Sequence, residues 1–242
     1  HNGNLTNTGD LAEMVQKLEG DPGKNNRGAT TDTEIMTALI GLQDEKNVEA
    51  SAIAVLPKLE GAFSLVFMDE KTLYAARDRH GVRPLVIGKL ERGWVVASES
   101  AALDIVGAAF VREVEPGEFL AINEDGIRSQ IWAMPDPKGC IFEYVYLARP
   151  DTAIAGQGVH ATRVRIGKRL AIEAPVEADL VIPVPESGTP AAIGYAQQSG
   201  IPYGLGLVKN SYVGRTFIQP SQTIRQLGIR LKLNPLREII EG

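Results

Sequence analysis

The first stretch whose residue types could do chemistry is His-Asn-Gly-Asn-Leu-Thr-Asn, at residues 1–7. Asn2 carries a side-chain amide, and the backbone N–H of Gly3 is not screened by a side chain. Two adjacent donors of this kind can point at one oxygen, as in the oxyanion hole of an acyl-transfer site. Asn-Gly is also a strong turn pair, and composition alone favours a turn here.

A second candidate is the sequence Val-Ile-Pro-Val-Pro-Glu-Ser-Gly-Thr-Pro, at residues 181–190. A strand that runs through a polar turn into a helix is where open α/β sheets bind ligands. The hydroxyl of Ser187 can face a metal ion or a phosphate, and Gly188 allows close approach to the backbone. The spacing by itself favours a plain strand-to-helix turn with a capping hydroxyl.

Residues 209–232 are basic in a chain that is acidic overall. A cationic loop that closes over an anionic ligand has this composition, although a run of charge is more often a solvated face. The basic and aromatic residues of this segment are Lys209, Tyr212, Arg215, Phe217, Arg225, Arg230 and Lys232.

The sequence Ala-Arg-Asp-Arg-His-Gly-Val-Arg-Pro-Leu, at residues 76–85, joins two predicted strands. A turn between strands accounts for its glycine. It does not account for Asp78, Arg79, His80 and Arg83, which fit a ligand-binding loop and a salt-bridged surface turn equally well.

The spacing of apolar residues predicts the helices and strands that position these residues, and it changes along the chain. Apolar residues at helical spacing predict helices in residues 10–20, 30–42 and 48–61. Thr31 and Glu34 stand at the spacing of a capping box, and Pro57 is expected to distort the third helix. Strands are predicted in pairs within 62–78, 83–99 and 118–132, with a short helix at 100–107 and a loop at 21–28. Helices followed by antiparallel strands predict a layered α+β unit.

A Pro/Gly break at residues 134–139 predicts a domain boundary, with domains at 1–138 and 139–242. Beyond it, helices and strands alternate. The predicted helices are 159–174, 190–200 and 221–232, and the predicted strands are 178–185 and 203–210. This alternation predicts an α/β domain with a parallel sheet and helices on its faces.

Composition narrows the class of protein. The chain has 242 residues, 44% of them hydrophobic, and a net charge of -5, which speaks against a nucleic-acid-binding surface. It shows no apolar run long enough for a bilayer, and its single cysteine fits a reducing, cytoplasmic location. His1 is not a translation start, and the last residues read as a helix that leads on to another element. The chain is therefore expected to be a central fragment of a longer protein.

In this order, these stretches resemble the amidophosphoribosyltransferase family, the glutamine phosphoribosylpyrophosphate amidotransferases. The resembling stretches are residues 1–7, 30–34, 76–88, 97–100, 140–151, 181–196 and 210–235. The resemblance implies an N-terminal-nucleophile hydrolase fold, the α/β/β/α sandwich of class II glutamine amidotransferases. An incomplete type I phosphoribosyltransferase domain is implied to follow it.

The implied enzyme is a pentosyltransferase of the glycosyltransferase class. It hydrolyses glutamine and transfers the ammonia to phosphoribosyl pyrophosphate, which gives 5-phosphoribosylamine in the first step of purine biosynthesis. The resemblance implies that Asn2 and Gly3 hold the oxyanion, that Asp32 binds the α-ammonium group of glutamine, and that Ser187 lies at a Mg²⁺ ion. The other implied substrate-binding residues are Arg79, His80, Gly188, Lys209, Tyr212, Arg215 and Thr216. Inhibitory purine nucleotides and assembly into a homo-oligomer are implied for the complete protein.

Two parts of the family pattern are missing from the sequence. One is the nucleophilic N-terminal cysteine, and the other is the pair of adjacent carboxylates in the ribosyl-phosphate loop. The chain by itself is therefore expected to be inactive. Cys140 matches the branch of the family that carries a [4Fe–4S] cluster, which needs three further cysteines from outside this chain. The alternative is that Cys140 packs as a small hydrophobic residue.

Two other functions are alternatives. The chain could belong to another class II amidotransferase, such as a glucosamine-phosphate synthase or an asparagine synthetase, but residues 184–196 speak against these. It could be a regulatory module that binds phosphoribosyl pyrophosphate without catalysis. A version of that module that also binds DNA would need a helix-turn-helix and a basic face, and the N-terminal half predicts neither.

Overall fold

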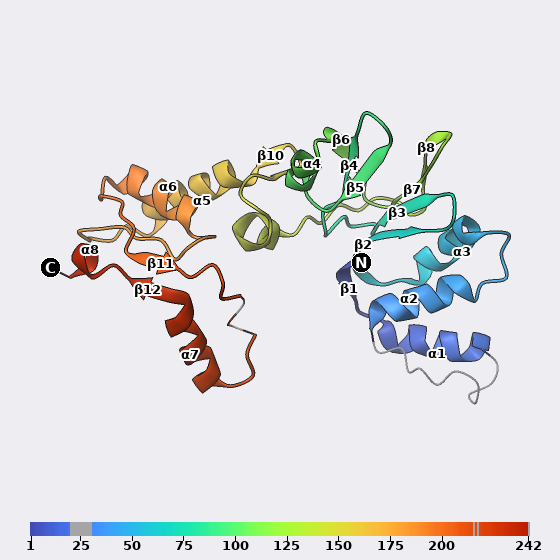
Figure 1. Ribbon diagram of the computed structural model, residues 1–242, viewed down its shortest axis with the longest axis horizontal. Helices are drawn as coiled ribbons and strands as arrows, with labels where there is room; N and C mark the ends of the chain where they lie inside the picture. The colour runs from blue at the N-terminus through green and yellow to red at the C-terminus, as the bar shows by residue number, and fades with distance from the viewer. Residues whose placement is uncertain (20–30, 215, 217, 242) are drawn as a thin grey trace. The chain divides into compact units, whose positions relative to one another are not determined.

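The structure, a computed structural model, describes residues 1–19, 31–214, 216 and 218–241. It divides into two compact units, His1–Cys140 and Ile141–Gly242, which are described separately (Figure 1). The predicted boundary lies between residues 138 and 139. The predicted loop at 21–28 and the residues Arg215 and Phe217 lie outside the described residues. No helix of the described residues is long and apolar enough to cross a bilayer.

The first unit contains two antiparallel sheets and four α-helices among its described residues. The five-stranded sheet has the order β1-β2-β3-β7-β8, and the three-stranded sheet has the order β5-β4-β6. The elements are β1 (Asn2–Leu5), α1 (Thr8–Glu19), α2 (Asp32–Gly41), α3 (Val48–Val55), a 3₁₀ turn (Leu56–Lys58), β2 (Gly61–Met68), β3 (Leu73–Arg77), β4 (Val86–Lys89), β5 (Trp94–Ala97), α4 (Ser100–Val106), β6 (Ala109–Glu113), β7 (Glu118–Asn123) and β8 (Gly126–Ile131).

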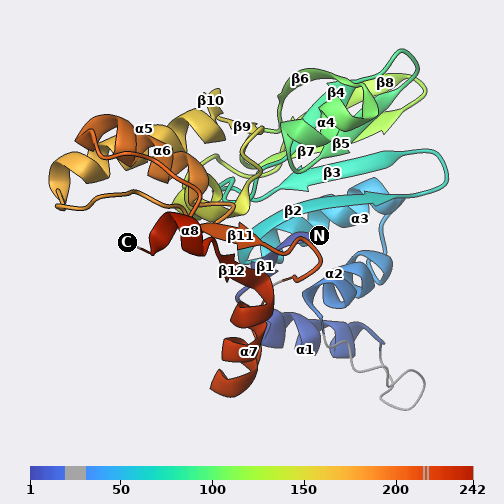
Figure 2. The same cartoon turned by 60° about the vertical axis from the view of Figure 1, so that its left-hand side comes forward.

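Neighbouring residues of each strand face different hydrophobic cores, and this arrangement gives the unit four layers. Tyr74 faces a core shared with α1, α2 and α3, while the next residue, Ala75, faces a second core. That second core includes Ile87 of the three-stranded sheet, whose neighbour Val86 turns toward Leu103 of α4. Successive side chains point to opposite faces of a strand, so each sheet is covered on both sides. The result is the predicted α/β/β/α sandwich (Figure 2).

Local sequence signals explain most of these elements. Thr31 and Glu34 form the predicted capping box at the start of α2, with both reciprocal hydrogen bonds present. α3 passes into a 3₁₀ turn where Pro57 stands, which confirms the predicted distortion. The turn that composition favoured at the start of the chain is wrong, because Asn2–Leu5 form β1 and pair with β2. β6 is a further strand that periodicity did not predict.

The second unit contains shorter elements. They are a π-helical turn (Glu143–Leu147), β9 (Ala153–Ile154), β10 (Gln157–Gly158), α5 (Val159–Glu173), α6 (Thr189–Ser199), β11 (Leu207–Lys209), α7 (Gln222–Lys232), β12 (Leu233–Pro235) and α8 (Arg237–Ile240). Among the described residues of this unit, the predicted parallel pairing is limited to one bridge, between Val181 and Tyr203. Pro183 and Pro185 have no N–H to donate to a ladder, which explains why residues 178–185 do not form a full strand.

Two glycines bring the backbones of α5 and α6 into contact. A Cβ atom on Gly194 of α6 would lie 2.0 Å from the carbonyl oxygen of Val164 in α5. A Cβ atom on Gly167 of α5 would lie 1.9 Å from the carbonyl oxygen of Ala191 in α6. Both distances are far below van der Waals contact, so only glycine fits at either position. This close approach fixes where α6, and the turn that leads into it, lies on α5.

Candidate active site on the edge of the first sheet

β1 is an edge strand, and among the described residues no strand pairs with its outer side. Gly3 lies opposite Phe63 of β2. The N–H of Phe63 donates to the Asp78 carboxylate (3.1 Å), and its carbonyl accepts from the Asp78 N–H (2.9 Å). Both backbone groups of Phe63 therefore face away from β1, which makes Gly3 and Phe63 a non-hydrogen-bonded pair. The N–H of Gly3 consequently points outward along the edge of the sheet.

Glycine is also the only residue type that fits at position 3 of β1. Its φ of 151° is unfavourable for residues with a side chain, and a Cβ atom would lie 1.9 Å from the carbonyl oxygen of Ala62. The glycine of the Asn-Gly pair therefore allows β1 to lie close to β2, whereas composition had suggested a turn here.

Asp32 lies on the same edge, two strand residues further along. The N–H of Leu5, which has the same outward direction as that of Gly3, donates to the Asp32 carboxylate (3.3 Å). Two residues of a strand span about 7 Å. Asp32 is the first residue of α2, so its position follows from the capping box and from the favourable helix dipole. The imidazole Nδ1 of His1 is 3.4 Å from its other carboxylate oxygen.

The carboxamide of Asn2 has contacts at both ends. Its Oδ1 accepts from Nε of Arg83 at 3.0 Å, and its Nδ2 donates to the hydroxyl of Ser98 at 3.3 Å. The structure thus brings Asn2, Gly3 and Asp32 to one edge of β1. Sequence reasoning missed Arg83 and Ser98 as parts of this site; the unexplained charges after β3 were a signal for the first.

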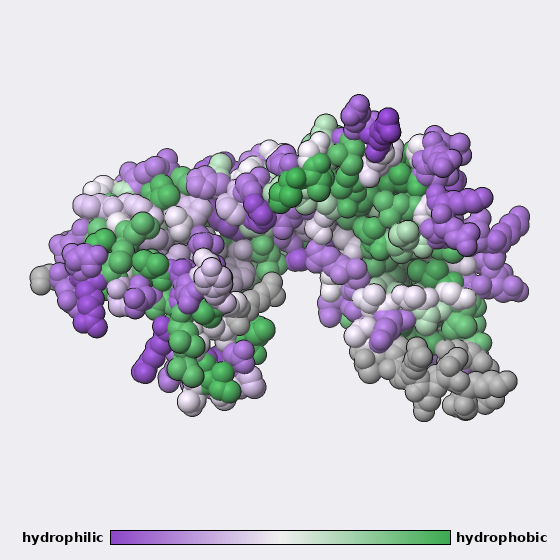
Figure 3. All heavy atoms as spheres, in the orientation of Figure 1, coloured by the Kyte–Doolittle hydropathy of each residue, from purple (hydrophilic) through white to green (hydrophobic). Residues whose placement is uncertain are grey.

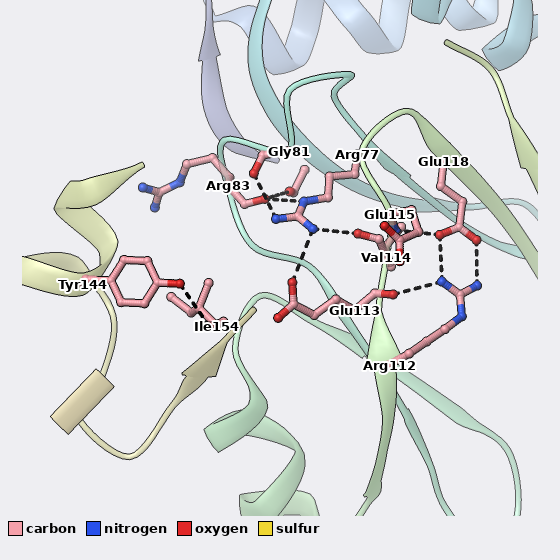
Figure 4. A network of polar contacts seen from close by, with 11 residues as sticks. Arg77, Gly81, Arg83, Arg112, Glu113, Val114, Glu115, Glu118, Tyr144 and Ile154 are labelled. Atoms are coloured by element: carbon pink, nitrogen blue, oxygen red, sulfur yellow. Dashed lines mark hydrogen bonds and ion pairs between the residues drawn. The ribbon is translucent and has the colours of Figure 1, made fainter. Parts of the chain in front are cut away.

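A buried arginine organises the loop that carries Arg83. Arg77 donates from Nε to the carbonyl of Arg83 (2.8 Å), from Nη1 to that of Val114 (2.7 Å) and from Nη2 to that of Gly81 (2.9 Å) (Figure 4). Burial lowers the pKa of Arg77 from its ordinary value, and the nearby carboxylate of Glu113 opposes that shift. The guanidinium, always protonated in proteins, uses its fork of donors to hold the turn between β3 and β4.

Arg79 and His80 are placed elsewhere. The Nδ1 atom of His80 lies 2.9 Å from the carbonyl oxygen of Asp136 and 3.3 Å from its carboxylate. Lys138 hydrogen-bonds that carboxylate and lowers the pKa of Asp136. Arg79 and His80 line a pocket of about 530 Å³ together with Trp132, whereas Asn2, Gly3 and Asp32 are not among its described lining residues. The two sets of predicted residues are therefore not brought to one pocket.

A second buried charge, on Glu118, ties β7 to its neighbours. Its side chain is 3% exposed and accepts two hydrogen bonds from Arg112 (2.8 and 2.6 Å). It also accepts from the hydroxyl of Ser129 and from the N–H of Glu115. Burial raises the pKa of Glu118, but these hydrogen bonds outweigh burial, and the pKa is lowered below its ordinary value.

The lowered pKa of Glu118 predicts an acid-sensitive contribution to stability. Because the folded pKa lies below the unfolded one, the contribution is complete above the unfolded pKa of about 4.3. It is lost as the pH falls through the folded pKa. Glu118→Gln is expected to lower the unfolding free energy at neutral pH by about 3 kcal/mol, because Arg112 and Ser129 lose a charged partner. The variant and the parent protein should converge in stability only as the pH falls below the folded pKa of Glu118.

Urea unfolding at a series of pH values measures this effect. Both tryptophans of the chain, Trp94 and Trp132, lie in the first unit, so their fluorescence reports its unfolding. Stability curves of the two proteins that run parallel from neutral to acid pH would contradict the assignment.

In the second unit, the structure places two predicted segments side by side. Ser187 and Gly188 form the turn before α6, and the N–H of Gly188 donates to the carbonyl of Val184 (3.2 Å). Lys209, at the end of β11, lies with its Nζ atom 3.3 Å from the carboxylate of Glu186. The basic segment thus begins next to the Pro-Glu-Ser-Gly turn.

The remaining predicted residues are less constrained. The side chain of Tyr212 is fully exposed, and the carbonyl of Thr216 accepts from the N–H of Gln219 at 3.4 Å. Cys140 is a partly exposed free thiol at the end of the first unit. Among the described residues there is no group of three or more His, Cys, Asp or Glu side chains placed to hold a metal ion.

A family model of known proteins matches most of the first unit. Residues 1–105 match the family model described as a glutamine amidotransferase domain. The four-layer sandwich and the edge of β1 define the first unit as a class II glutamine amidotransferase domain with the N-terminal-nucleophile hydrolase fold.

Relatives with the same name match the whole chain. Amidophosphoribosyltransferase of Mycobacterium tuberculosis is 66% identical over 100% of this chain and 46% of its own length. The Bacillus subtilis protein of that name is 45% identical, over 100% and 50% respectively. Over its whole length this chain is similar to amidophosphoribosyltransferases, and it spans about half the length of the curated relatives it matches.

Two solved structures are also similar to the whole chain. Glutamine phosphoribosylpyrophosphate amidotransferase from B. subtilis, complexed with ADP and GMP, superimposes with a TM-score of 0.87 at 45% identity. That match covers 100% of this chain and 52% of the solved one. A structure described as the allosteric regulatory enzyme of purine biosynthesis also has a TM-score of 0.87 at 45% identity, over 100% and 51% of the two chains.

Proposed function

We propose that this chain is part of an amidophosphoribosyltransferase, which hydrolyses glutamine and transfers the ammonia to phosphoribosyl pyrophosphate to form 5-phosphoribosylamine for purine biosynthesis. The observation that carries the proposal is the edge of β1. It presents the Asn2 amide and the Gly3 N–H side by side, with the Asp32 carboxylate two residues away. The similarity of the whole chain to amidophosphoribosyltransferases supports the assignment.

The geometry suits the two ends of glutamine. Attack on the side-chain amide carbon forms a tetrahedral intermediate whose oxygen is negatively charged, and two adjacent N–H donors stabilise that charge. The α-ammonium group at the other end of glutamine would pair with the carboxylate of Asp32. In the extended substrate these ends are separated by a distance comparable with two strand residues. The residues of this chain bind and orient the substrate and hold the oxyanion, and the family pattern assigns the attack to a cysteine thiol.

The second unit is proposed to contribute to the phosphoribosyl pyrophosphate site of a type I phosphoribosyltransferase domain. Support comes from the turn at Ser187 and Gly188 before α6 and from Lys209 beside it. Tyr212, Arg215 and Thr216 belong to the segment proposed to close over the substrate. The hydroxyl of Ser187 and the carboxylate of Glu186 are oxygen ligands of the kind that Mg²⁺ prefers. A bound Mg²⁺ ion would neutralise charge on the departing diphosphate.

For Cys140 we propose a role as one ligand of a [4Fe–4S] cluster in the longer protein. The support is its place before the Ile-Phe-Glu-Tyr-Val-Tyr stretch. A cluster requires four thiolates, and this chain holds one cysteine, so its residues do not fit a complete cluster and no reaction step is assigned to it. Iron and sulfide analysis of the longer protein, purified without oxygen, tests the proposal. An iron-free, active enzyme would contradict it.

Regulation and assembly complete the proposal. The solved relative complexed with ADP and GMP supports inhibition by purine nucleotides, and we propose a homo-oligomer for the longer protein. The metabolic substrates and the single cysteine accord with a cytoplasmic location.

Activity assays on the longer protein that contains this chain test the function. We expect glutamate formation from glutamine, and pyrophosphate release from phosphoribosyl pyrophosphate with either glutamine or ammonia. Glutamine hydrolysis without any use of phosphoribosyl pyrophosphate would indicate another class II amidotransferase. Binding of phosphoribosyl pyrophosphate with neither activity would indicate a regulatory module.

A further inference from the structure

We propose that Arg83 and Ser98 are positioning residues that orient the carboxamide of Asn2, so that it presents an N–H group to the oxyanion. The inference rests on the proposed function of Asn2 in glutamine hydrolysis. A carboxamide has one accepting end and one donating end, and only the donating end can stabilise an oxyanion. Something must therefore select between the two orientations of Asn2.

Arg83 makes that selection, because a guanidinium has donors and no acceptor. Its Nε atom lies 3.0 Å from the Asn2 side chain, so the Oδ1 end must face it and the Nδ2 end must point away. The reverse orientation would set the amide N–H groups against the N–H of Arg83. The hydroxyl of Ser98 accepts one N–H from Nδ2 at 3.3 Å. That bond fixes the rotation of the amide and leaves its second N–H for the oxyanion.

Arg83 is itself held by the sheet. Its carbonyl accepts from Nε of buried Arg77 (2.8 Å) and from the hydroxyl of Ser64 (3.1 Å). Ser64 is the residue of β2 that pairs with Asn2. The loop that carries Arg83 is thus anchored both to the buried arginine and to the strand partner of its target, while the Arg83 side chain extends away from Arg77 (Figure 4).

The charge of Arg83 also favours catalysis. A hydrogen bond from a cation to Oδ1 polarises the amide, which strengthens the bonds that its own N–H groups donate. Donors that are oriented before the reaction need no reorganisation when the negative charge develops. Arg83 therefore acts on the transition state through Asn2 and is expected to affect kcat more than KM.

A double-mutant cycle in the longer protein tests the inference. Arg83→Met is expected to lower kcat for glutamine hydrolysis by about 10- to 100-fold, with KM changed by less than about 3-fold. Arg83→Lys, which keeps a cationic donor, should recover part of the loss. Ser98→Ala should lower kcat by a smaller factor. Arg92→Met replaces an exposed arginine of the β4–β5 turn and serves as the matched control. Thermal melting of each variant shows that it is folded.

The decisive variant combines Asn2→Ala with Arg83→Met. If Arg83 acts through Asn2, the double variant is no slower than Asn2→Ala alone. A further loss of the same size as in the single Arg83 variant would overturn the inference, as would an unchanged kcat in Arg83→Met. If Asn2→Ala itself leaves glutamine hydrolysis unchanged, the proposed role of Asn2 fails, and this outcome is distinct from a failure of the positioning role.

Discussion

Asn2→Ala is expected to lower kcat for glutamine hydrolysis by about 10²- to 10³-fold in the longer protein, because it removes one donor from the oxyanion hole. The substitution leaves the backbone of β1 intact, so Gly3 keeps its outward N–H and Asp32 keeps its bond to Leu5. The KM for glutamine should change little, because the lost bond forms only as the negative charge develops. Steady-state assay of glutamate formation measures both constants.

Synthesis driven by ammonia serves as the internal control, since it needs no oxyanion on glutamine. It should be unchanged in Asn2→Ala. The matched variant is Asn4→Ala, two residues along β1, where the amide donates to the carbonyl of Leu5 (3.1 Å). Equal losses of the glutamine-driven and ammonia-driven reactions would show that Asn2 has a structural role.

Arg77→Met is expected to destabilise the first unit by about 3–5 kcal/mol. The guanidinium is almost fully buried, and the substitution leaves the carbonyls of Gly81, Arg83 and Val114 without their donors. Buried acceptors that lose their partners bear the full cost of desolvation. Glu113, 3.7 Å from the guanidinium, would lose its cation as well. Urea unfolding followed by tryptophan fluorescence measures the change.

Arg92→Met provides the comparison, because Arg92 is exposed in a turn of the same unit; a substitution there should change the unfolding free energy by less than about 0.5 kcal/mol. A loss below about 1 kcal/mol in Arg77→Met would mean that water or a neighbouring side chain replaces the guanidinium at the three carbonyls.

The helices of the first unit could be predicted from sequence because their signals are local. The capping box of Thr31 and Glu34 and the break at Pro57 lie within a few residues of the elements they define. β1 could not be predicted in this way. Its partner Phe63 lies 60 residues from Gly3 along the chain, and this long-range pairing overrode the local preference of Asn-Gly for a turn. In the second unit, alternation of apolar segments indicated a strand whose prolines prevent full pairing.

The residues of the candidate site also divide into those that could be predicted from sequence and those that could not. Asn2, Gly3, Asp32 and Ser187 were found from sequence because their residue types suit a reaction and because the family motifs contain them. The contact between Arg83 and Asn2 joins residues 81 positions apart. Only the antiparallel pairing of β1 with β2, and the anchoring of the loop after β3, bring the two together. The sequence marked the charges of that loop as unexplained, and the fold supplies the explanation for one of them.

The backbone contact of α5 with α6 also limits how the second unit can move. A slide of α6 by one turn would bring side chains onto carbonyls that now face Gly167 and Gly194. Such ratcheting steps are one way in which packed helices switch between states, and here the glycine pair blocks them. The two helices therefore behave as one rigid body, and the turn at residues 185–188 takes its position from α5. Adjustment to a bound ligand within this unit is therefore expected in the segments outside α5 and α6.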